Sequence, residues 1–217
     1  MGKKGNSSGR WLDRQRRDPY VRRAHDEGTV SRAHYKLEQL DRKYRLVFPN
    51  QLVLELGAAP GGWTQYLSDR IANGLIIAVD PLPVAGGAKV EIITGEYGED
   101  SVDERIGELL GDRRLNLVLS DMAPNLSGIR VADQAASIHL ADLCLDAAAR
   151  WLRPTGSMVV KVFHGEGLGG WLAEAKGQFR QVRLVKPEAS RKESREAYVV
   201  ATGWSGGNQG HSAPNPV

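Results

Sequence analysis

A chain of 217 residues with 41% hydrophobic residues is long enough to bury one sizeable core, so the sequence predicts a single α/β domain. Its one cysteine, Cys144, excludes an intramolecular disulfide and sits in an apolar run, where we expect a buried thiol in a reducing compartment. The N-terminus has no apolar signal-like segment, and no stretch is long enough to span a bilayer. We therefore expect a cytoplasmic protein without a membrane partner, and we expect it to be a monomer.

The net charge is only +3, but basic residues gather near the N-terminus. Residues 1–36 hold ten Lys or Arg against four acidic residues, and a second basic stretch covers residues 180–195. This asymmetry favours nucleic acid bound through its phosphates, although a solvated arm without a partner has the same composition. We expect residues 1–29 to form a basic arm, partly helical between 11 and 24. Residues 30–203 would form the folded domain, and residues 204–217, rich in Gly, Ser, Asn and Pro, a disordered tail.

The first sustained helical pattern follows Ser31, which is a plausible N-cap. Apolar residues recur at positions 33, 37, 40 and 44, and Lys36 lies at the border of that stripe, from which it can reach a neighbouring cleft.

Strands and helices alternate after residue 50. Short apolar runs predict buried strands at 52–56, 75–79, 90–93, 115–119 and 158–163, and helical patterns occupy 62–72, 101–110, 134–152 and 168–178. Such alternation predicts a parallel sheet covered by helices on both faces. Two further strands, 179–185 and 197–202, are joined only by the polar loop 186–195, so they are expected to be antiparallel. The predicted fold class is therefore α/β, with a seven-stranded, mostly parallel sheet and an antiparallel last strand.

A glycine-rich turn, residues 57–62, follows the first predicted strand and opens the next helix. Glycines there permit close backbone approach, and the helix N-terminus offers unpaired N–H groups, which suits a nucleotide-like cofactor. Asp80, at the end of the second strand, can accept hydrogen bonds from a ribose. The turn lacks the Gly-x-Gly-x-x-Gly spacing and no Walker lysine follows, so NAD(P) and ATP are poorly supported. A tight strand–helix turn without a ligand is the plainer alternative, and Trp63 would divide its surface between the core and the cofactor.

Ionisable residues from distant parts of the chain are expected at the same edge of the sheet. Asp121 ends one parallel strand and Lys161 lies near the end of another, while Glu196 begins the antiparallel strand. Lys161 stands out because an unpaired ammonium is costly to bury in an apolar run. Each of the others has a plainer alternative: Asp121 as a helix cap, Glu196 in a surface pair with a neighbouring arginine, and Lys36 as a solvated helix residue. The histidines have no close His or Cys pairing, so no metal site is expected.

Five strings in order resemble the FtsJ-type RNA 2′-O-methyltransferases, most closely the bacterial members that act on uridine in large-subunit ribosomal RNA. They are Ser-Arg-Ala at 31–33 leading into Lys36, Leu-Gly-Ala-Ala-Pro-Gly-Gly-Trp at 56–63, Ser-Asp-Met-Ala-Pro-Asn at 120–125, Val-Lys-Val-Phe at 160–163 and Ser-Arg-Glu at 194–196. The resemblance implies a Rossmann-like fold that binds S-adenosylmethionine, with large-subunit ribosomal RNA as the partner. It implies a catalytic tetrad of Lys36, Asp121, Lys161 and Glu196.

The same resemblance implies a set of residues lining the cofactor site, namely Gly61, Trp63, Asp80, Glu96 and Asp121. Bacterial relatives usually carry Asp where this chain has Glu96. Compared with Asp, Glu96 keeps the carboxylate acceptor but adds a methylene.

The implied reaction is in-line attack of a ribose 2′-oxygen on the methyl group, with Lys161 taking or orienting the proton. Lys161 would have to be neutral to take it, a state that burial and the charge of Lys36 favour and that Asp121 and Glu196 oppose. Two alternatives remain open: the same chemistry on transfer RNA or an mRNA cap, and a non-catalytic RNA-binding assembly factor.

Overall fold

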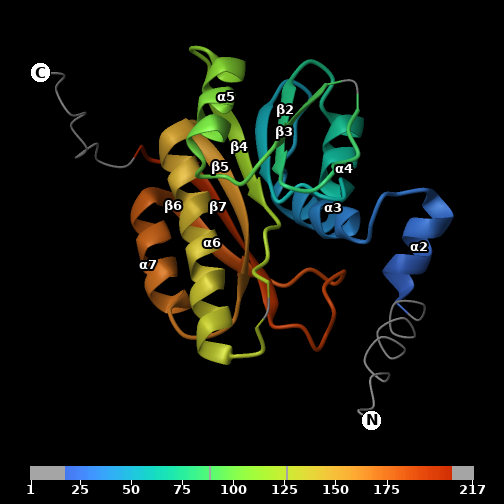
Figure 1. Cartoon of the computed structure of the whole chain (residues 1–217), viewed down its shortest axis with the longest axis vertical. Helices are drawn as coiled ribbons and strands as arrows, with labels where there is room; N and C mark the ends of the chain where they lie inside the picture. Colours follow the sequence, from blue (N-terminus) through green and yellow to red (C-terminus); the bar gives the residue numbers. More distant parts are fainter. Residues whose placement is uncertain (1–17, 88, 126, 207–217) are drawn as a thin grey trace, which may run out of the picture.

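The computed structural model describes residues 18–87, 89–125 and 127–206. What the sequence predicts for residues 1–17 of the basic arm and for the tail beyond residue 206 lies outside these residues. The boundaries between arm, domain and tail stay predictions. The fold is α/β, with helices on both faces of one sheet (Figure 1). No helix in the described part has both the length and the hydropathy to cross a bilayer.

The elements follow one another in the predicted order. They are α2 (Pro19–Glu27), α3 (Ala33–Tyr44), β1 (Leu52–Leu56), α4 (Gly62–Arg70), β2 (Leu75–Asp80), β3 (Val90–Thr94), α5 (Asp100–Leu110), β4 (Leu115–Ser120), α6 (Arg130–Trp151), β5 (Leu152–Phe163), α7 (Leu168–Gln178), β6 (Phe179–Val185) and β7 (Glu196–Trp204).

The seven strands are arranged in the order β3-β2-β1-β4-β5-β7-β6. The strands from β3 to β5 are parallel neighbours, whereas β7 runs antiparallel to both β5 and β6. The predicted seven-stranded sheet with an antiparallel last strand is therefore confirmed. Because β7 runs antiparallel to β5, its first residue, Glu196, pairs with Phe163 at the edge where the parallel strands end.

Two hydrophobic cores form, one on each face of the sheet. One contains buried residues from α5, α6 and α7, including Cys144, which is fully buried as predicted. The other lies under α3 and α4. Since side chains of a strand alternate between the faces, each strand contributes to both cores.

Several boundaries differ from the predictions, most of them by one or two residues. The N-cap of α3 is Arg32, not Ser31, whose hydroxyl instead accepts a hydrogen bond from the N–H of Ala33 (3.3 Å). Strand β5 begins six residues early, since Leu152 already pairs with β4 before a register shift. Strand β7 continues to Trp204, whose ring packs on Phe179 with centroids 4.9 Å apart.

Candidate active site

Strand alternation places the predicted catalytic residues on one face of the sheet. Leu119 and Val159 belong to the core under α3 and α4. Asp121 and Lys161 each lie two positions further along the same strand direction, so their side chains belong to that same face. Glu196 stands on this edge because it is the first residue of antiparallel β7.

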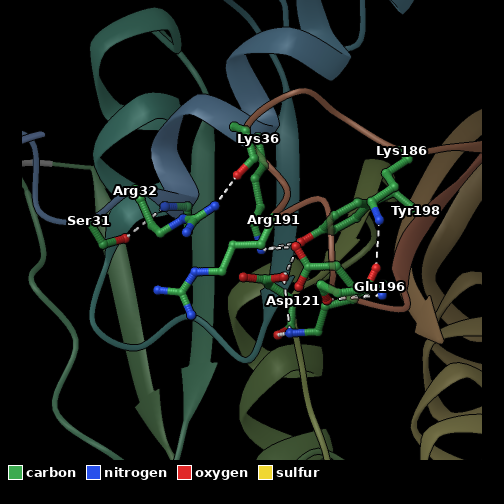
Figure 2. Close-up of polar contacts among 12 residues, drawn as sticks. Ser31, Arg32, Lys36, Asp121, Lys186, Arg191, Glu196 and Tyr198 are labelled. Carbon is green, nitrogen blue, oxygen red and sulfur yellow. Dashed lines mark hydrogen bonds and ion pairs between the residues drawn. The ribbon is translucent and has the colours of Figure 1, made fainter. Parts of the chain in front are cut away.

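Two ion pairs and one tyrosine connect the four predicted catalytic side chains. Figure 2 shows Lys36, Asp121 and Glu196 gathered around Tyr198. Lys36, on α3, is buried and its Nζ lies 2.9 Å from Oε1 of Glu196. The Nζ of Lys161 lies 3.2 Å from Oδ1 of Asp121 and also donates to the main-chain oxygen of Asp121. Tyr198 joins the pairs, because its hydroxyl donates to Oδ1 of Asp121 (2.6 Å) and accepts from Nζ of Lys36 (3.1 Å). The structure thus brings all four residues together.

Tyr198 is the residue of this cluster that the sequence analysis missed. It lies directly opposite Lys161 in the β5–β7 register and is fully buried. A signal was present, since Tyr198 is two positions after Glu196 on a strand and must share its face.

The two carboxyl groups are held ionised by the lysines. Burial alone would raise the pKa of Asp121, but the charges of Lys161 and Lys36, with the hydrogen bond from Tyr198, lower it. Burial likewise acts to raise the pKa of Glu196, and Lys36 outweighs it through its charge and hydrogen bond. The pKa of Tyr198 is raised well above its ordinary value, first by burial and then by the charge of Asp121, so its hydroxyl keeps its proton.

A second ionic cluster holds the β6–β7 loop against α3. Asp18, the N-cap of α2, pairs with Arg32, and its Oδ2 lies 3.3 Å from Nε of Arg191. Arg32 also donates to the main-chain oxygen of Ala189, whose N–H in turn donates to Oε1 of Gln39 (3.0 Å). Three segments distant in sequence are therefore joined beside Lys36.

The β6–β7 loop is also held by hydrogen bonds between its own residues, before it reaches Glu196. The Nζ of Lys186 donates to the main-chain oxygens of Lys192 (3.0 Å) and Ser194 (2.6 Å). The hydroxyl of Ser194 accepts from the N–H of Glu196 (3.1 Å). These contacts set the point at which β7 begins.

The glycine turn requires glycine for steric reasons. Gly57 has φ +73°, and a Cβ there would come within 2.8 Å of main-chain and side-chain atoms of Met122. Gly61 has φ +112° and would meet the main-chain oxygen of Ala85 at 2.7 Å. The turn is therefore packed against the segment that follows Asp121 and against the loop after β2, and α4 begins immediately beyond it.

Asp80 ties the turn to the neighbouring strand end. Its Oδ2 accepts from the N–H of Ala59 (2.9 Å) and its Oδ1 from that of Leu82 (2.8 Å). Each oxygen retains a further lone pair for a ligand hydroxyl. Glu96 follows β3 at the same edge and is exposed, and the N–H of the adjacent Gly95 donates to the main-chain oxygen of Asp80 (3.3 Å).

Trp63 is a core residue. The sequence predicts that it divides its surface between core and cofactor, but only 2% of it is exposed. Its indole N–H donates to the main-chain oxygen of Ala33 (2.8 Å), and its ring lies 5.8 Å from that of Tyr198. The indole therefore links the turn to α3 and lies against Tyr198, which differs from the predicted half-exposed wall.

Glu55 is a buried carboxyl group that the sequence analysis missed. It lies in β1, is 1% exposed, and accepts a hydrogen bond from the hydroxyl of Thr64 (2.8 Å). Burial raises its pKa to about 8, against the hydrogen bond from Thr64 and with the help of Asp121 and Asp80. A carboxyl group in an apolar run is the same signal that singled out Lys161.

A cavity of about 350 Å³ lies at the opposite edge of the sheet. Its lining includes Arg45, Phe48, Asn116 and Arg153, and none of the predicted site residues. It is therefore separate from the cluster at the carboxyl ends of the strands, where ligands of open α/β sheets bind.

The arrangement can position and deprotonate a hydroxyl group. It combines two lysine side chains, two carboxylates and a neutral phenol beside a glycine turn that ends in a helix N-terminus. Such groups can orient a nucleophilic oxygen and accept its proton, and the turn can hold a nucleotide-like group next to it.

Comparisons with known proteins agree with this geometry. The family model described as FtsJ-like methyltransferase matches residues 29–204. Two curated proteins named ribosomal RNA large subunit methyltransferase E are similar: one from Stutzerimonas stutzeri, 45% identical over 94% of this chain and all of its own length, and one from Cellvibrio japonicus, 46% identical over 94% of this chain and 97% of its own. A crystal structure described as a ribosomal RNA methyltransferase from Plasmodium falciparum superposes with a TM-score of 0.73 at 30% identity, covering 80% of this chain and 97% of that one. This chain belongs to the FtsJ-like methyltransferase family.

Proposed function

We propose that this enzyme transfers the methyl group of S-adenosylmethionine to the ribose 2′-oxygen of a uridine in large-subunit ribosomal RNA. The observation that carries the proposal is the pair of lysine–carboxylate contacts joined by Tyr198 at the edge where the glycine turn ends. The names of the relatives from S. stutzeri and C. japonicus support the RNA and the subunit.

The residues at the turn fit S-adenosylmethionine. Gly61 opens α4, so N–H groups without intrahelical partners stand where a carboxylate can bind. Asp80 would accept the ribose hydroxyls and exposed Glu96 would lie towards the adenine, with Asp121 on the side of the reaction and Trp63 supporting the turn from the core. When bound, the cofactor supplies an electrophilic methyl group.

The catalytic residues prepare the ribose hydroxyl. Lys161 is the group that accepts or orients the hydroxyl proton at its Nζ, and Asp121 fixes that nitrogen through its side-chain and main-chain oxygens. Lys36 is held by Glu196 and Tyr198, so its charge lies close to the reacting oxygen and to Asp121.

Methyl transfer from labelled S-adenosylmethionine tests the proposal, with undermethylated large subunits, free ribosomal RNA and transfer RNA offered in parallel. We expect label on large-subunit RNA as an alkali-stable ribose methyl group. Label only on transfer RNA would retain the chemistry and replace the substrate. No label, with RNA and cofactor binding intact, would favour an assembly factor.

Lys161→Ala tests the catalytic assignment. We expect the rate of methyl transfer to fall at least about 100-fold, because a general base contributes that much or more, while cofactor affinity changes little. Lys176→Ala, an exposed lysine on α7, is the matched control and should behave as wild type. Wild-type activity in Lys161→Ala would remove Lys161 from the mechanism.

The enzyme acts as a cytoplasmic monomer in this proposal. All four catalytic side chains meet within one chain, so a second copy is not needed to complete the site. A substrate in the large ribosomal subunit places the reaction in the cytoplasm. Molar mass in solution by light scattering, measured with activity over the same concentrations, tests the monomer.

A further inference from the structure

Two large apolar side chains project into solvent where α6 begins. Ile129 is 65% exposed and Val131 73% exposed, the highest values for large hydrophobic residues in the part of the chain that the structure describes. They flank exposed Arg130. Residues 129–131 are called the α6 tip below. Large apolar side chains that are exposed close together in the chain can mark a contact surface.

Hydrogen bonds hold the α6 tip in place. The carboxylate of Asp133 accepts from the N–H of Ser127 (2.7 Å), the hydroxyl of Ser127 (2.8 Å) and the N–H of Gly128 (3.2 Å). The N–H of Asp133 also donates to the main-chain oxygen of Ile129 (2.9 Å). The apolar side chains are thus displayed from an ordered turn.

Hydrogen bonds connect the start of α6 to the end of β5 and to the residue that precedes β7. Gln134 donates to the main-chain oxygen of Phe163 (3.1 Å), the residue that pairs with Glu196 in the β5–β7 register. Arg195 donates to Oε1 of Gln134 (3.4 Å) and to the main-chain oxygen of His164. In Figure 1 the start of α6 and the β6–β7 loop, which leads to Glu196, both lie at the lower end of the molecule.

Methylation of a ribose in folded RNA requires that the target nucleotide be separated from its neighbouring bases. A ribose inside a structured RNA is enclosed by stacked bases, so the target nucleotide must leave its stack before its 2′-oxygen can reach Lys161. Proteins commonly stabilise such a distortion by placing apolar side chains against or between bases.

We propose that Ile129 and Val131 contact the bases next to the target nucleotide and keep that nucleotide out of its stack. Arg130, between them, faces a phosphate of the same strand. This inference rests on the RNA methylation proposed above and adds the element that makes the target accessible.

The double variant Ile129→Ser/Val131→Ser tests the inference. Because both side chains are exposed, we expect an unchanged melting temperature and unchanged cofactor binding. With undermethylated large subunits as substrate, we expect kcat to fall about tenfold or more and KM to change little, since the contact stabilises the unstacked state rather than the initial complex. Leu184→Ser, an exposed leucine on β6, is the matched control and should retain wild-type kinetics.

Chemical probing of the bases gives a readout that general weakening of binding would not move. Once wild-type enzyme has marked the target, large subunits saturated with each protein and S-adenosylhomocysteine are probed at the target and its two neighbours. We expect wild type to change the reactivity of these bases and the double variant to leave the pattern of unbound subunits. Ile129→Val/Val131→Ile, which keeps the tip apolar, should restore both kcat and the wild-type pattern.

The outcomes separate this inference from the proposed function. Wild type that methylates no RNA contradicts the proposed function. If wild type methylates and the serine variant matches it in kcat and probing, the inference alone is wrong. A loss confined to KM with a wild-type probing pattern also contradicts it, as does equal loss in the conservative variant.

Discussion

A single hydroxyl group joins the two ion pairs of the proposed catalytic cluster. The Tyr198 hydroxyl donates to Asp121 and accepts from Lys36, so it transmits the position of α3 to the residue that holds Lys161. Its pKa is raised well above the ordinary value, so the hydroxyl keeps its proton and remains a donor. Tyr198 is therefore a positioning residue for both lysines.

Tyr198→Phe should keep the ring packing and lose both hydrogen bonds. A hydrogen bond to a charged group contributes about 1.5–3 kcal/mol, so we expect the rate of methyl transfer to fall about 10- to 100-fold. The pH profile of kcat should also shift, because Asp121 loses a donor that lowers its pKa. Tyr44→Phe is the control, and an unchanged rate and pH profile for Tyr198→Phe would contradict the bridging role.

At the scale of elements, the start of α2 holds the β6–β7 loop in place. Its N-cap Asp18 is buried and contacts Arg32 before α3 and Arg191 in the β6–β7 loop. That loop leads directly to Glu196. The contact between Asp18 and Arg191 therefore helps to position the proposed catalytic carboxylate of Glu196.

Asp18→Ala should release the β6–β7 loop. It removes a helix cap and leaves two arginines without their carboxylate, so we expect the free energy of unfolding to fall by about 2 kcal/mol. Hydrogen exchange should accelerate at the amides of residues 186–195 more than elsewhere. Asp26→Ala, an exposed acid on the same helix, is the control; unchanged exchange in the loop of the Asp18 variant would contradict the fastening role.

At the scale of the whole molecule, we expect the free energy of unfolding to depend on pH through the titration of Glu55. Its pKa of about 8 in the folded state lies above the ordinary value of 4.5, so the folded protein holds a proton that the unfolded chain releases. The stability associated with neutral Glu55 is present below pH 4.5 and is lost as the pH rises towards about 8.

Glu55→Gln should flatten this dependence, because glutamine stays neutral and can still accept from Thr64. Between pH 6 and pH 8.5 we expect the variant to lose about 2 kcal/mol less stability than wild type in urea unfolding. Glu104→Gln, exposed on α5, is the control. Parallel pH profiles for wild type and Glu55→Gln would show that Glu55 is not the group responsible.

The sequence by itself determined the elements and the chemical types at the site. Strand and helix periods depend on neighbouring residues, so β1 and β6 have their predicted bounds and the other strands differ only at their ends. The glycine turn and the strand-end positions of Asp121, Lys161 and Glu196 follow from the same local signals.

Only the tertiary structure decided how these residues meet. The hydroxyl of Tyr198 contacts residues 77 and 162 positions away in the chain, and Asp18 meets Arg191 across 173 positions. The insertion of β7 between β5 and β6 and the packing of α3 over the sheet edge create these contacts. A local pattern has no information on such pairs, since they depend on the order of strands and on which side chains a shared core brings together.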